Sequence, residues 1–220
     1  MDINKYIDHT LLKPVASLAQ IKKICQEAAQ YEFASVCINP CFVKYAAEQL
    51  KDSPVKVCTV IGFPLGNTTT QAKVEEAKQA LKDGADEFDM VLNQSWIKSG
   101  EIEAAQADIA AVKSAIGDHI LKVILEICNL TADEIAEASQ ISEKANADFV
   151  KTSTGFGSGG ATPEAVKIMK ANISDAVKIK ASGGIRDLQT AEMYINLGVS
   201  RLGASSGVQI MQGKASNQNY

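Results

Sequence analysis

The sequence predicts a single-domain α/β protein folded as a TIM (β/α)8 barrel, and three observations favour this fold class. First, the chain has 220 residues, 46% of them hydrophobic, which suffices for one well-formed core. Second, short apolar runs alternate with amphipathic segments along the chain. Third, the centres of these runs lie roughly 20 to 35 residues apart, about the length of one βα unit of a parallel sheet. Eight such units fit one compact barrel domain over residues 1–220.

Eight apolar runs are predicted to form the strands. They cover residues 6–10, 34–39, 55–62, 87–92, 121–126, 148–153, 177–182 and 200–204. A doubly wound open sheet is the structural alternative for such a pattern. It is disfavoured because no G-x-G-x-x-G sequence follows the first run, and because its strands should be apolar on both faces.

Helical spacing and capping signals mark the segments between these runs. Apolar residues recur on one face of 18–28 and again of 102–116. Thr131 and Glu134 have the spacing of a capping box, and Pro163 stands where proline is favoured, just inside a helix start. These signals predict helices between the strands, as a barrel requires.

Composition excludes nucleic-acid and membrane partners. The formal net charge is −4, and only two of the 22 basic residues are arginines, Arg186 and Arg201, so a basic stripe is lacking. The N-terminus has no basic head before an apolar stretch, and no run approaches the ~18 apolar residues that span a bilayer. We therefore expect a soluble, cytoplasmic protein.

The cysteines and histidines do not suggest a disulfide framework or a metal site. Five cysteines are odd in number and show no C-x-x-C spacing: Cys25, Cys37, Cys41, Cys58 and Cys128. We interpret them as free thiols in a reducing compartment. His9 and His119 lie far apart, and no group of His and Cys has the spacing of metal ligands. We expect no metal.

Two lysines indicate covalent chemistry. Lys151 and Lys180 each lie inside a short β-prone apolar run that ends in small residues, where burying an ammonium group is unfavourable. An amine becomes a nucleophile at neutral pH when desolvation or a nearby cation lowers its pKa. A single such lysine would more simply snorkel from a strand end. Two that face one cavity predict imine formation by one of them.

Period-two alternation indicates which polar side chains point into the barrel. Phe88, Met90 and Leu92 share the face that would lie under helices, so Asp89 points inward. The same alternation directs Lys151 and Lys180 inward from adjacent strands, about 4.8 Å apart. Other residues expected on the inward face are Asp8, Cys37, Asn39 and Glu126. TIM barrels place active sites at the carboxyl ends of strands, which favours a catalytic Asp89, although it could serve only to neutralise a lysine.

Two loops predict a phosphate site. Gly183 and Gly184 follow the seventh run, and Ser205 and Ser206 follow the eighth. TIM barrels commonly build phosphate sites from these two loops, because glycine admits backbone amides and serine hydroxyls donate hydrogen bonds. Two ordinary strand-to-helix turns are the alternative. The glycine pair and the serine pair occur together, each after the expected strand, and this favours a phosphorylated substrate.

Four segments resemble, in order, the motifs of the class I deoxyribose-phosphate aldolases. They are DHTLLK at 8–13, EFDMVLN at 87–93, FVKTSTG at 149–155 and IKASGGIR at 179–186. The resemblance extends from about residue 6 to about residue 207. It implies a barrel enzyme without a metal or other cofactor. Such an enzyme reversibly cleaves 2-deoxy-D-ribose 5-phosphate to acetaldehyde and D-glyceraldehyde 3-phosphate in deoxyribonucleoside breakdown.

The resemblance also implies roles for individual residues. Lys151 is similar to the imine-forming lysine, Lys180 to the neighbour that lowers its pKa, and Asp89 to the acid/base aspartate. Tyr220 ends a polar tail, 213–220, that we expect to be mobile, and it is similar to a terminal tyrosine that helps to move a proton in some relatives. The residues expected to contact substrate are Asp8, Cys37, Thr152, Gly155, Gly183, Gly184, Ser205 and Ser206.

One position departs from the family pattern. Some relatives carry a lysine directly after the TSTG segment, whereas here Phe156 opens a glycine-rich loop. Phosphate binding would then depend on loop amides and serines. The preference over unphosphorylated deoxyribose could therefore be weaker than in those relatives.

Three other functions share part of this pattern. A transaldolase or another sugar-phosphate aldolase would use the same lysine chemistry. A phosphosugar isomerase without covalent catalysis would keep the phosphate loops but tolerate Lys151→Arg. A non-catalytic phosphosugar-binding regulator would not need Lys151, Lys180 and Asp89 in one cavity. We expect phosphosugar and aldehyde substrates, and a homo-oligomer, namely a dimer.

Overall fold

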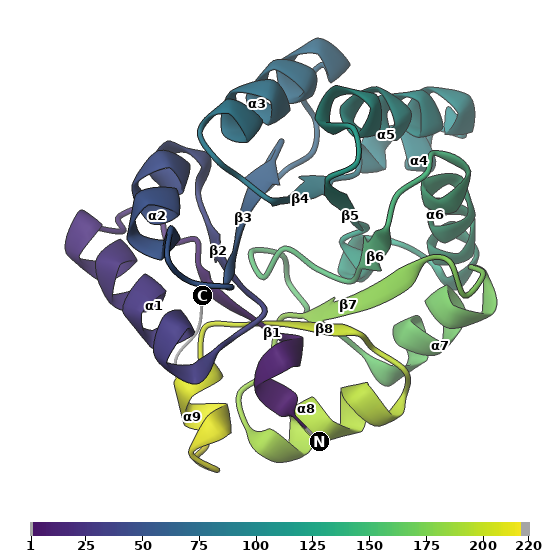
Figure 1. Ribbon diagram of the computed structural model, residues 1–220. Helices are drawn as coiled ribbons and strands as arrows, with labels where there is room; N and C mark the ends of the chain where they lie inside the picture. The colour runs from purple at the N-terminus through teal and green to yellow at the C-terminus, as the bar shows by residue number, and fades with distance from the viewer. Residues whose placement is uncertain (1, 217–220) are drawn as a thin grey trace.

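The structure is a computed structural model, and it describes residues 2–216. Eight parallel strands close into a barrel in the order β1 to β8, and β8 pairs with β1 to complete the ring. Figure 1 looks along this barrel, with the strands as a central ring and the helices around it. The predicted TIM barrel is confirmed, and the doubly wound open sheet is excluded.

All eight predicted runs form strands. Each strand lies inside its predicted run or overruns it by one residue. The strands are β1 Ile7–Leu11, β2 Ser35–Ile38, β3 Lys56–Ile61, β4 Glu87–Val91, β5 Ile120–Ile124, β6 Phe149–Lys151, β7 Lys178–Ser182 and β8 Arg201–Ala204.

Two helices begin at the predicted capping signals. Thr131 and Glu134 form the predicted capping box, and the helix that Pro163 opens is capped by the hydroxyl of Thr162. The α-helices are α1 Leu18–Tyr31, α2 Val43–Leu50, α3 Thr70–Lys82, α4 Gln94–Lys98, α5 Ile102–Ile116, α6 Ala132–Lys144, α7 Pro163–Ala171, α8 Leu188–Asn196 and α9 Gly207–Met211. Short 3-10 turns are η1 Ile3–Tyr6, η2 Pro40–Phe42 and η3 Ile127–Asn129.

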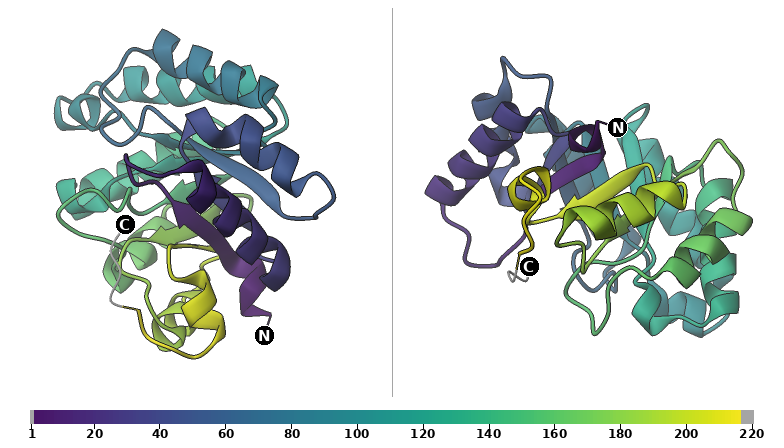
Figure 2. Two further views of the ribbon diagram at one scale, coloured as in Figure 1. Left: turned by 90° about the vertical axis from the view of Figure 1, so that its left-hand side faces the viewer. Right: turned by 90° about the horizontal axis from the view of Figure 1, so that it is seen from below.

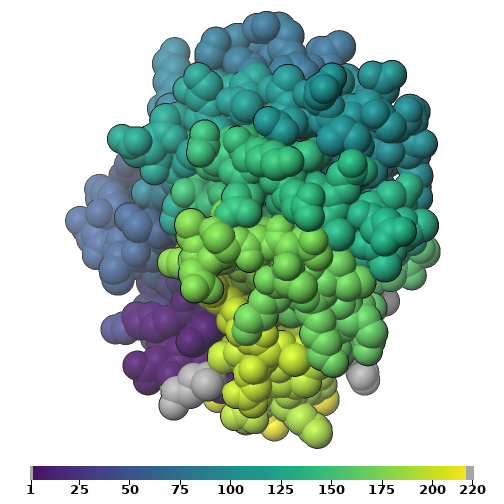
Figure 3. Space-filling view, turned by 90° about the vertical axis from the view of Figure 1, so that its right-hand side faces the viewer, coloured from purple at the N-terminus to yellow at the C-terminus, as the bar shows by residue number. Residues whose placement is uncertain are grey.

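The main apolar core lies between the strands and the surrounding helices. Figure 2 shows the helices on the outer side of the strands in two further views. In Figure 3 the outer surface of one side is made mainly by segments from the middle and C-terminal parts of the chain. Phe88, Met90 and Leu92 are fully buried in this core, as alternation predicted. A smaller apolar cluster in the barrel interior consists of Leu12, Cys37, Cys58 and Val60.

Three further expectations concern the chain as a whole. Among residues 2–216, no helix combines the length and the apolar character that crossing a bilayer requires. All five cysteines are free. In the predicted tail, the backbone N–H of Ser216 donates to the carbonyl of Arg186 at 3.1 Å, so the chain is held there against the loop after β7. Residues 217–220, and with them Tyr220, lie outside the described residues.

Candidate active site

Lys151 and Lys180 lie side by side on neighbouring strands. Lys151 is the last residue of β6, Lys180 is the third residue of β7, and the two are direct register partners. Their residues are only 3% and 0% exposed. Both amines therefore project into the barrel, as the alternation predicted, and the register places them at the same height.

A single carboxylate oxygen joins the two amines. Oδ2 of Asp89, on β4, accepts a hydrogen bond from Nζ of Lys151 at 2.7 Å and from Nζ of Lys180 at 2.8 Å. Its other oxygen, Oδ1, accepts from Nζ of Lys122, on β5, at 2.9 Å. Asp89 is fully buried. It is therefore the shared counter-ion of three ammonium groups.

More charged groups lie toward the amino ends of the strands. Glu87 accepts from Nζ of Lys122 at 2.6 Å and from both terminal nitrogens of Arg201, at 2.8 and 3.0 Å. Asp8 forms ion pairs with Lys180 and Arg201. The contacts thus join four cations and three carboxylates into one charge network: Lys122, Lys151, Lys180 and Arg201 with Asp8, Glu87 and Asp89.

Burial and ion pairing act in opposite directions within this charge network. Burial disfavours the ionised carboxyl of Asp89, but the positive charges of Lys122, Lys151 and Lys180 outweigh it and hold the pKa of Asp89 well below its ordinary value. Burial likewise disfavours the ammonium form of Lys180, but Asp8 and Asp89 outweigh it and raise the pKa of Lys180. Asp89 is therefore ionised, and Lys180 protonated, at neutral pH.

Sequence reasoning missed three members of the charge network, although the signal was present. Glu87 stands two residues before Asp89 and so shares its inward face. Lys122 shares its face with Glu126, which alternation had already placed inward. Arg201 alternates with Leu202 and Ala204, the outward residues of its run. Each could have been found by extending the period-two rule to the amino ends of the strands.

A cavity of about 370 Å³ opens at the carboxyl ends of β6, β7 and β8, and it is called the phosphate cavity because residues of both predicted phosphate loops line it. Four of the predicted substrate residues line it: Gly155, Gly183, Gly184 and Ser205. The glycine-rich segment 157–160, Ile185 and Arg186 complete the lining. Backbone N–H groups of such loops and an arginine guanidinium are the donors that phosphate oxygens prefer. Sequence reasoning counted Arg186 but did not assign it to the site.

The other predicted substrate residues within 2–216 lie deeper. Thr152 donates its hydroxyl to the carbonyl of Ser182 at 3.1 Å and accepts from the Ser182 N–H at 3.0 Å. The hydroxyl of Ser206, which is 2% exposed, donates to a backbone carbonyl after β7. Cys37 lies in the interior apolar cluster and Asp8 in the charge network, both fully buried. Through these hydrogen bonds Thr152 and Ser206 hold the strand ends and loops of the site in place.

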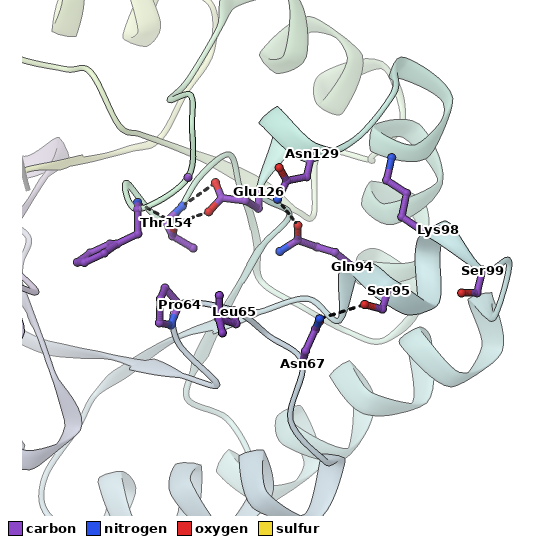
Figure 4. Close-up of a pocket in the computed structure, with 12 residues that line it drawn as sticks. Pro64, Leu65, Asn67, Gln94, Ser95, Lys98, Ser99, Glu126, Asn129 and Thr154 are labelled. Carbon is purple, nitrogen blue, oxygen red and sulfur yellow. Dashed lines mark hydrogen bonds between the residues drawn. The ribbon is translucent and has the colours of Figure 1, made fainter.

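A second cavity, of about 480 Å³, lies on the other side of the loop after β6, and Gly157 lines both cavities. Figure 4 shows its wall, in which Gln94 and Ser95 of α4 form hydrogen bonds with Asn129 and Asn67 of neighbouring segments. Phe156 lines this second cavity, and its ring meets that of Phe63 edge-on with centroids 5.3 Å apart. The aromatic ring that replaces the lysine of some relatives is thus directed toward Phe63.

One group of side chains has the composition of a metal site but not its electrostatics. Cys37, Cys58 and Asp89 bring their ligand atoms within 4.8 Å of one another. A cation there would meet the three ammonium groups that already hold the Asp89 carboxylate. Burial and the hydrogen bond with Cys37 also raise the pKa of Cys58 well above its ordinary value, so this thiol stays protonated and is a poor ligand.

Known proteins that resemble this chain identify its family. The model of the DeoC/LacD family of aldolases matches residues 3–213. The chain is 56% identical to the deoxyribose-phosphate aldolase of Staphylococcus carnosus and 54% identical to that of Streptococcus gordonii, each over 220 residues and 100% of both chains. The tetrameric deoxyribose phosphate aldolase from Aeropyrum pernix superposes with a TM-score of 0.87 at 31% identity, covering 96% of this chain and 89% of that one. The chain therefore belongs to the DeoC/LacD family of aldolases.

Proposed function

We propose that this protein is a class I aldolase that reversibly cleaves 2-deoxy-D-ribose 5-phosphate to acetaldehyde and D-glyceraldehyde 3-phosphate, in deoxyribonucleoside breakdown. The observation that carries the proposal is the Asp89 oxygen shared by Lys151 and Lys180 inside the barrel. The phosphate cavity at the carboxyl ends of the same strands supports a phosphorylated substrate. Two relatives that are more than half identical to this chain are named deoxyribose-phosphate aldolase, which agrees with a phosphorylated deoxyribose as substrate.

Lys151 has the fewest carboxylate partners of the four cations in the charge network. Among residues 2–216, Lys122, Lys180 and Arg201 each contact at least two carboxylate groups, whereas Lys151 contacts only Asp89. Loss of the Lys151 proton leaves three cations against three carboxylates. We therefore assign Lys151 as the nucleophile.

The reaction then follows the chemistry of an imine. The neutral amine of Lys151 adds to the C1 aldehyde of the open-chain sugar, and the carbinolamine loses water to give a protonated imine. The bond between C2 and C3 breaks, and its electron pair moves into the imine to form an enamine. The C3 hydroxyl loses its proton and becomes the aldehyde of glyceraldehyde 3-phosphate. Protonation of C2 and hydrolysis release acetaldehyde and restore the amine.

Proton transfer is assigned to the groups around Lys151. Asp89 takes the C3 hydroxyl proton through a water molecule and assists dehydration of the carbinolamine. Lys180, protonated in the resting site, stabilises the Asp89 carboxylate and relays protons to Lys151. Tyr220 lies outside the described residues, and we assign it an accessory role in protonating the enamine.

The phosphate cavity orients the substrate. The phosphate group lies several atoms from the reacting bond, so its binding energy can hold C1 against Lys151 and lower the barrier at the reacting centre. Gly155, Gly183, Gly184, Ser205 and Arg186 line this cavity and would bind the phosphate group. Ser206 and Thr152 do not line the cavity; their hydroxyl groups hydrogen-bond to the backbone of the seventh strand and of the loop after it.

We also propose a homodimer in the cytoplasm. Val15 precedes α1 and Leu18 is its first residue; they are 84% and 54% exposed, so they offer apolar area to a partner. Five free thiols suit a reducing compartment. Light scattering of the purified protein tests the assembly, and a dimer would have twice the 23.4 kDa mass of the chain.

Product analysis tests the proposed reaction. We expect the purified protein to convert 2-deoxy-D-ribose 5-phosphate to equal amounts of acetaldehyde and glyceraldehyde 3-phosphate, and Lys151→Arg to be inactive because a guanidinium does not form the imine. Other cleavage products would indicate a transaldolase or a different sugar-phosphate aldolase. Isomerised sugar phosphate together with an active Lys151→Arg variant would indicate an isomerase.

A further inference from the structure

We propose that Glu126 is a positioning residue that holds the phosphate-binding loop in place through Thr154. The loop comprises residues 155–161, here called the glycine loop, which follows β6 and forms one wall of the phosphate cavity. The inference rests on the proposed function, because it takes the substrate phosphate as the anion that this loop binds. Glu126 itself does not line the phosphate cavity, so any influence on phosphate must pass through the loop.

The glycine loop has little in its own sequence to order it. Four of its seven residues are glycines: Gly155, Gly157, Gly159 and Gly160. Glycine loses more conformational freedom on ordering than any other residue. The largest side chain of the loop, Phe156, is 42% exposed. The loop must therefore be ordered by contacts with neighbouring segments.

Glu126 provides such a contact from the end of β5. Its Oε1 accepts the backbone N–H of Thr154 at 3.2 Å, and its Oε2 accepts the Thr154 hydroxyl. The oxygen of that hydroxyl accepts the N–H of Phe156 at 3.0 Å, inside the loop. Figure 4 shows the Glu126 carboxylate directed at Thr154. One buried carboxylate is thus linked by hydrogen bonds to the first turn of the glycine loop.

The backbone around Glu126 fits this role. Glu126 has φ +57°, in the left-handed region that residues with side chains seldom adopt, and it is 3% exposed. The glycine loop passes directly over it. A Cβ atom on Gly157 would lie 3.2 Å from Oε2 of Glu126 and 2.9 Å from Sγ of Cys128, so a larger residue would push the loop away. The carboxylate is therefore in contact with the loop backbone as well as with Thr154.

The other end of the glycine loop is held by the turn after β7. The N–H of Ala161 donates to the carbonyls of Ser182 and Gly183, at 3.0 and 3.1 Å. A Cβ atom on Gly160 would lie 2.3 Å from the Gly183 oxygen, so the two backbones are in direct contact. Because Gly183 also lines the phosphate cavity, this contact joins two walls of that cavity. Without Glu126 the loop would lose its carboxylate contact at the Thr154 end and keep this attachment at the Ala161 end.

Steady-state kinetics with two sugars, deoxyribose 5-phosphate and unphosphorylated deoxyribose, test the inference. For Glu126→Gln, we expect KM for the phosphorylated sugar to rise about tenfold, because the amide nitrogen cannot accept the Thr154 hydroxyl. By contrast, KM for the unphosphorylated sugar, and kcat for both sugars, should change less than about threefold. Thr154→Val should likewise raise KM for the phosphorylated sugar alone. Thr154→Ser, which keeps the hydroxyl, should have the wild-type KM.

A matched control exists on the opposite face of the barrel. Glu143, at the end of α6, accepts the N–H of Ser174 at 3.1 Å and also the Ser174 hydroxyl. Ser174 lies between α7 and β7. Glu143 thus contacts Ser174 as Glu126 contacts Thr154, but away from the phosphate cavity. Glu143→Gln should leave both KM values unchanged. If Glu126→Gln raises KM equally for both sugars, lowers only kcat, or changes nothing, the inference is wrong.

A binding measurement separates this inference from the proposed reaction. Inorganic phosphate should raise the Tm of the wild-type protein, and Glu126→Gln should need about ten times more phosphate for the same shift. Equal phosphate responses, or none in the wild type, would overturn the role of Glu126 whatever the enzyme catalyses. A wild-type protein that produces no acetaldehyde but still shows the tenfold difference would instead contradict the proposed function alone.

Discussion

Lys151 and Lys180 are register partners on adjacent strands, and each donates a hydrogen bond to the same oxygen of Asp89, at 2.7 and 2.8 Å. Two ammonium groups held this close repel each other, and one shared carboxylate oxygen compensates only part of that repulsion. Lys180 has a second carboxylate partner in Asp8, whereas Lys151 has none among the described residues. Lys151 therefore has fewer carboxylate partners than Lys180, and the proposed chemistry begins at its nitrogen.

Asp89→Asn should lower kcat by about 10²–10⁴-fold, because the amide cannot take a proton from the substrate hydroxyl. The measurement is acetaldehyde release from deoxyribose 5-phosphate by variant protein whose fold has been checked by circular dichroism. Asp108→Asn is the matched control, since Asp108 is also fully buried and paired with a lysine but lies outside the charge network. A folded Asp89→Asn variant with wild-type kcat would contradict the assigned role.

Lys180→Met should lower kcat at least about 100-fold at neutral pH, because it removes the cation beside Lys151 and unbalances the charge around Asp89. Lys178→Met is the comparison, because Lys178 stands on the same strand but is exposed, with its amine 5.9 Å from the ring of Phe149. We expect this second variant to keep kcat within about twofold. Equal losses in both variants would mean that strand packing, and not the position of the amine, is responsible.

A buried ion pair outside the site should contribute to stability without affecting catalysis. Lys73 on α3 and Asp108 on α5 are both fully buried, and their charged groups are 2.6 Å apart. Lys73→Met should lower the free energy of unfolding by about 3–5 kcal/mol, because Asp108 is left as an uncompensated buried charge. Adding Asp108→Leu should recover part of this loss in urea titrations. A double variant less stable than Lys73→Met alone would disprove the explanation.

The charge network also predicts how stability depends on pH. In the folded state the pKa values of Asp8, Glu87 and Asp89 are lowered, so these acids stabilise the fold above their unfolded values of about 4 and lose that effect as pH falls further. The raised pKa values of Lys122 and Lys180 stabilise the fold below about pH 10 and lose that effect only at higher pH. The urea midpoint should therefore be nearly constant from about pH 6 to 9 and fall below about pH 4. A steep change of the urea midpoint between pH 6 and 8 would contradict this account, because it would mean that histidines and not the charge network set the pH dependence of stability.

The fold could be predicted because its signals are local. Each apolar run, capping box and helix-initiating proline can be recognised within a few residues, and the regular spacing of the runs left few alternatives to a barrel. The inward direction of Asp89, Lys151 and Lys180 followed from the same short-range alternation. These residues meet because strands of a closed barrel converge on one interior.

The supporting contacts could not be predicted in the same way. The pairing of Arg201 with Glu87 joins β8 to β4 across the barrel, and 114 positions separate the two residues in sequence. Glu126 was expected to face inward, but its contact with Thr154 depends on the left-handed backbone at Glu126 and on how the glycine loop folds over it. Thr152 was expected to bind substrate, yet its hydroxyl bonds to the backbone of β7. Such details depend on loop conformation, which a sequence pattern does not specify.

The central claim, that Lys151 is the amine that condenses with the aldehyde, can be measured directly. The wild-type protein is treated with acetaldehyde and sodium borohydride, digested, and mapped by mass spectrometry. We predict a two-carbon adduct, an ethyl group, on the peptide that contains Lys151, and no such adduct in the Lys151→Arg variant. An adduct on Lys180 or on surface lysines, with Lys151 unmodified, would contradict the account.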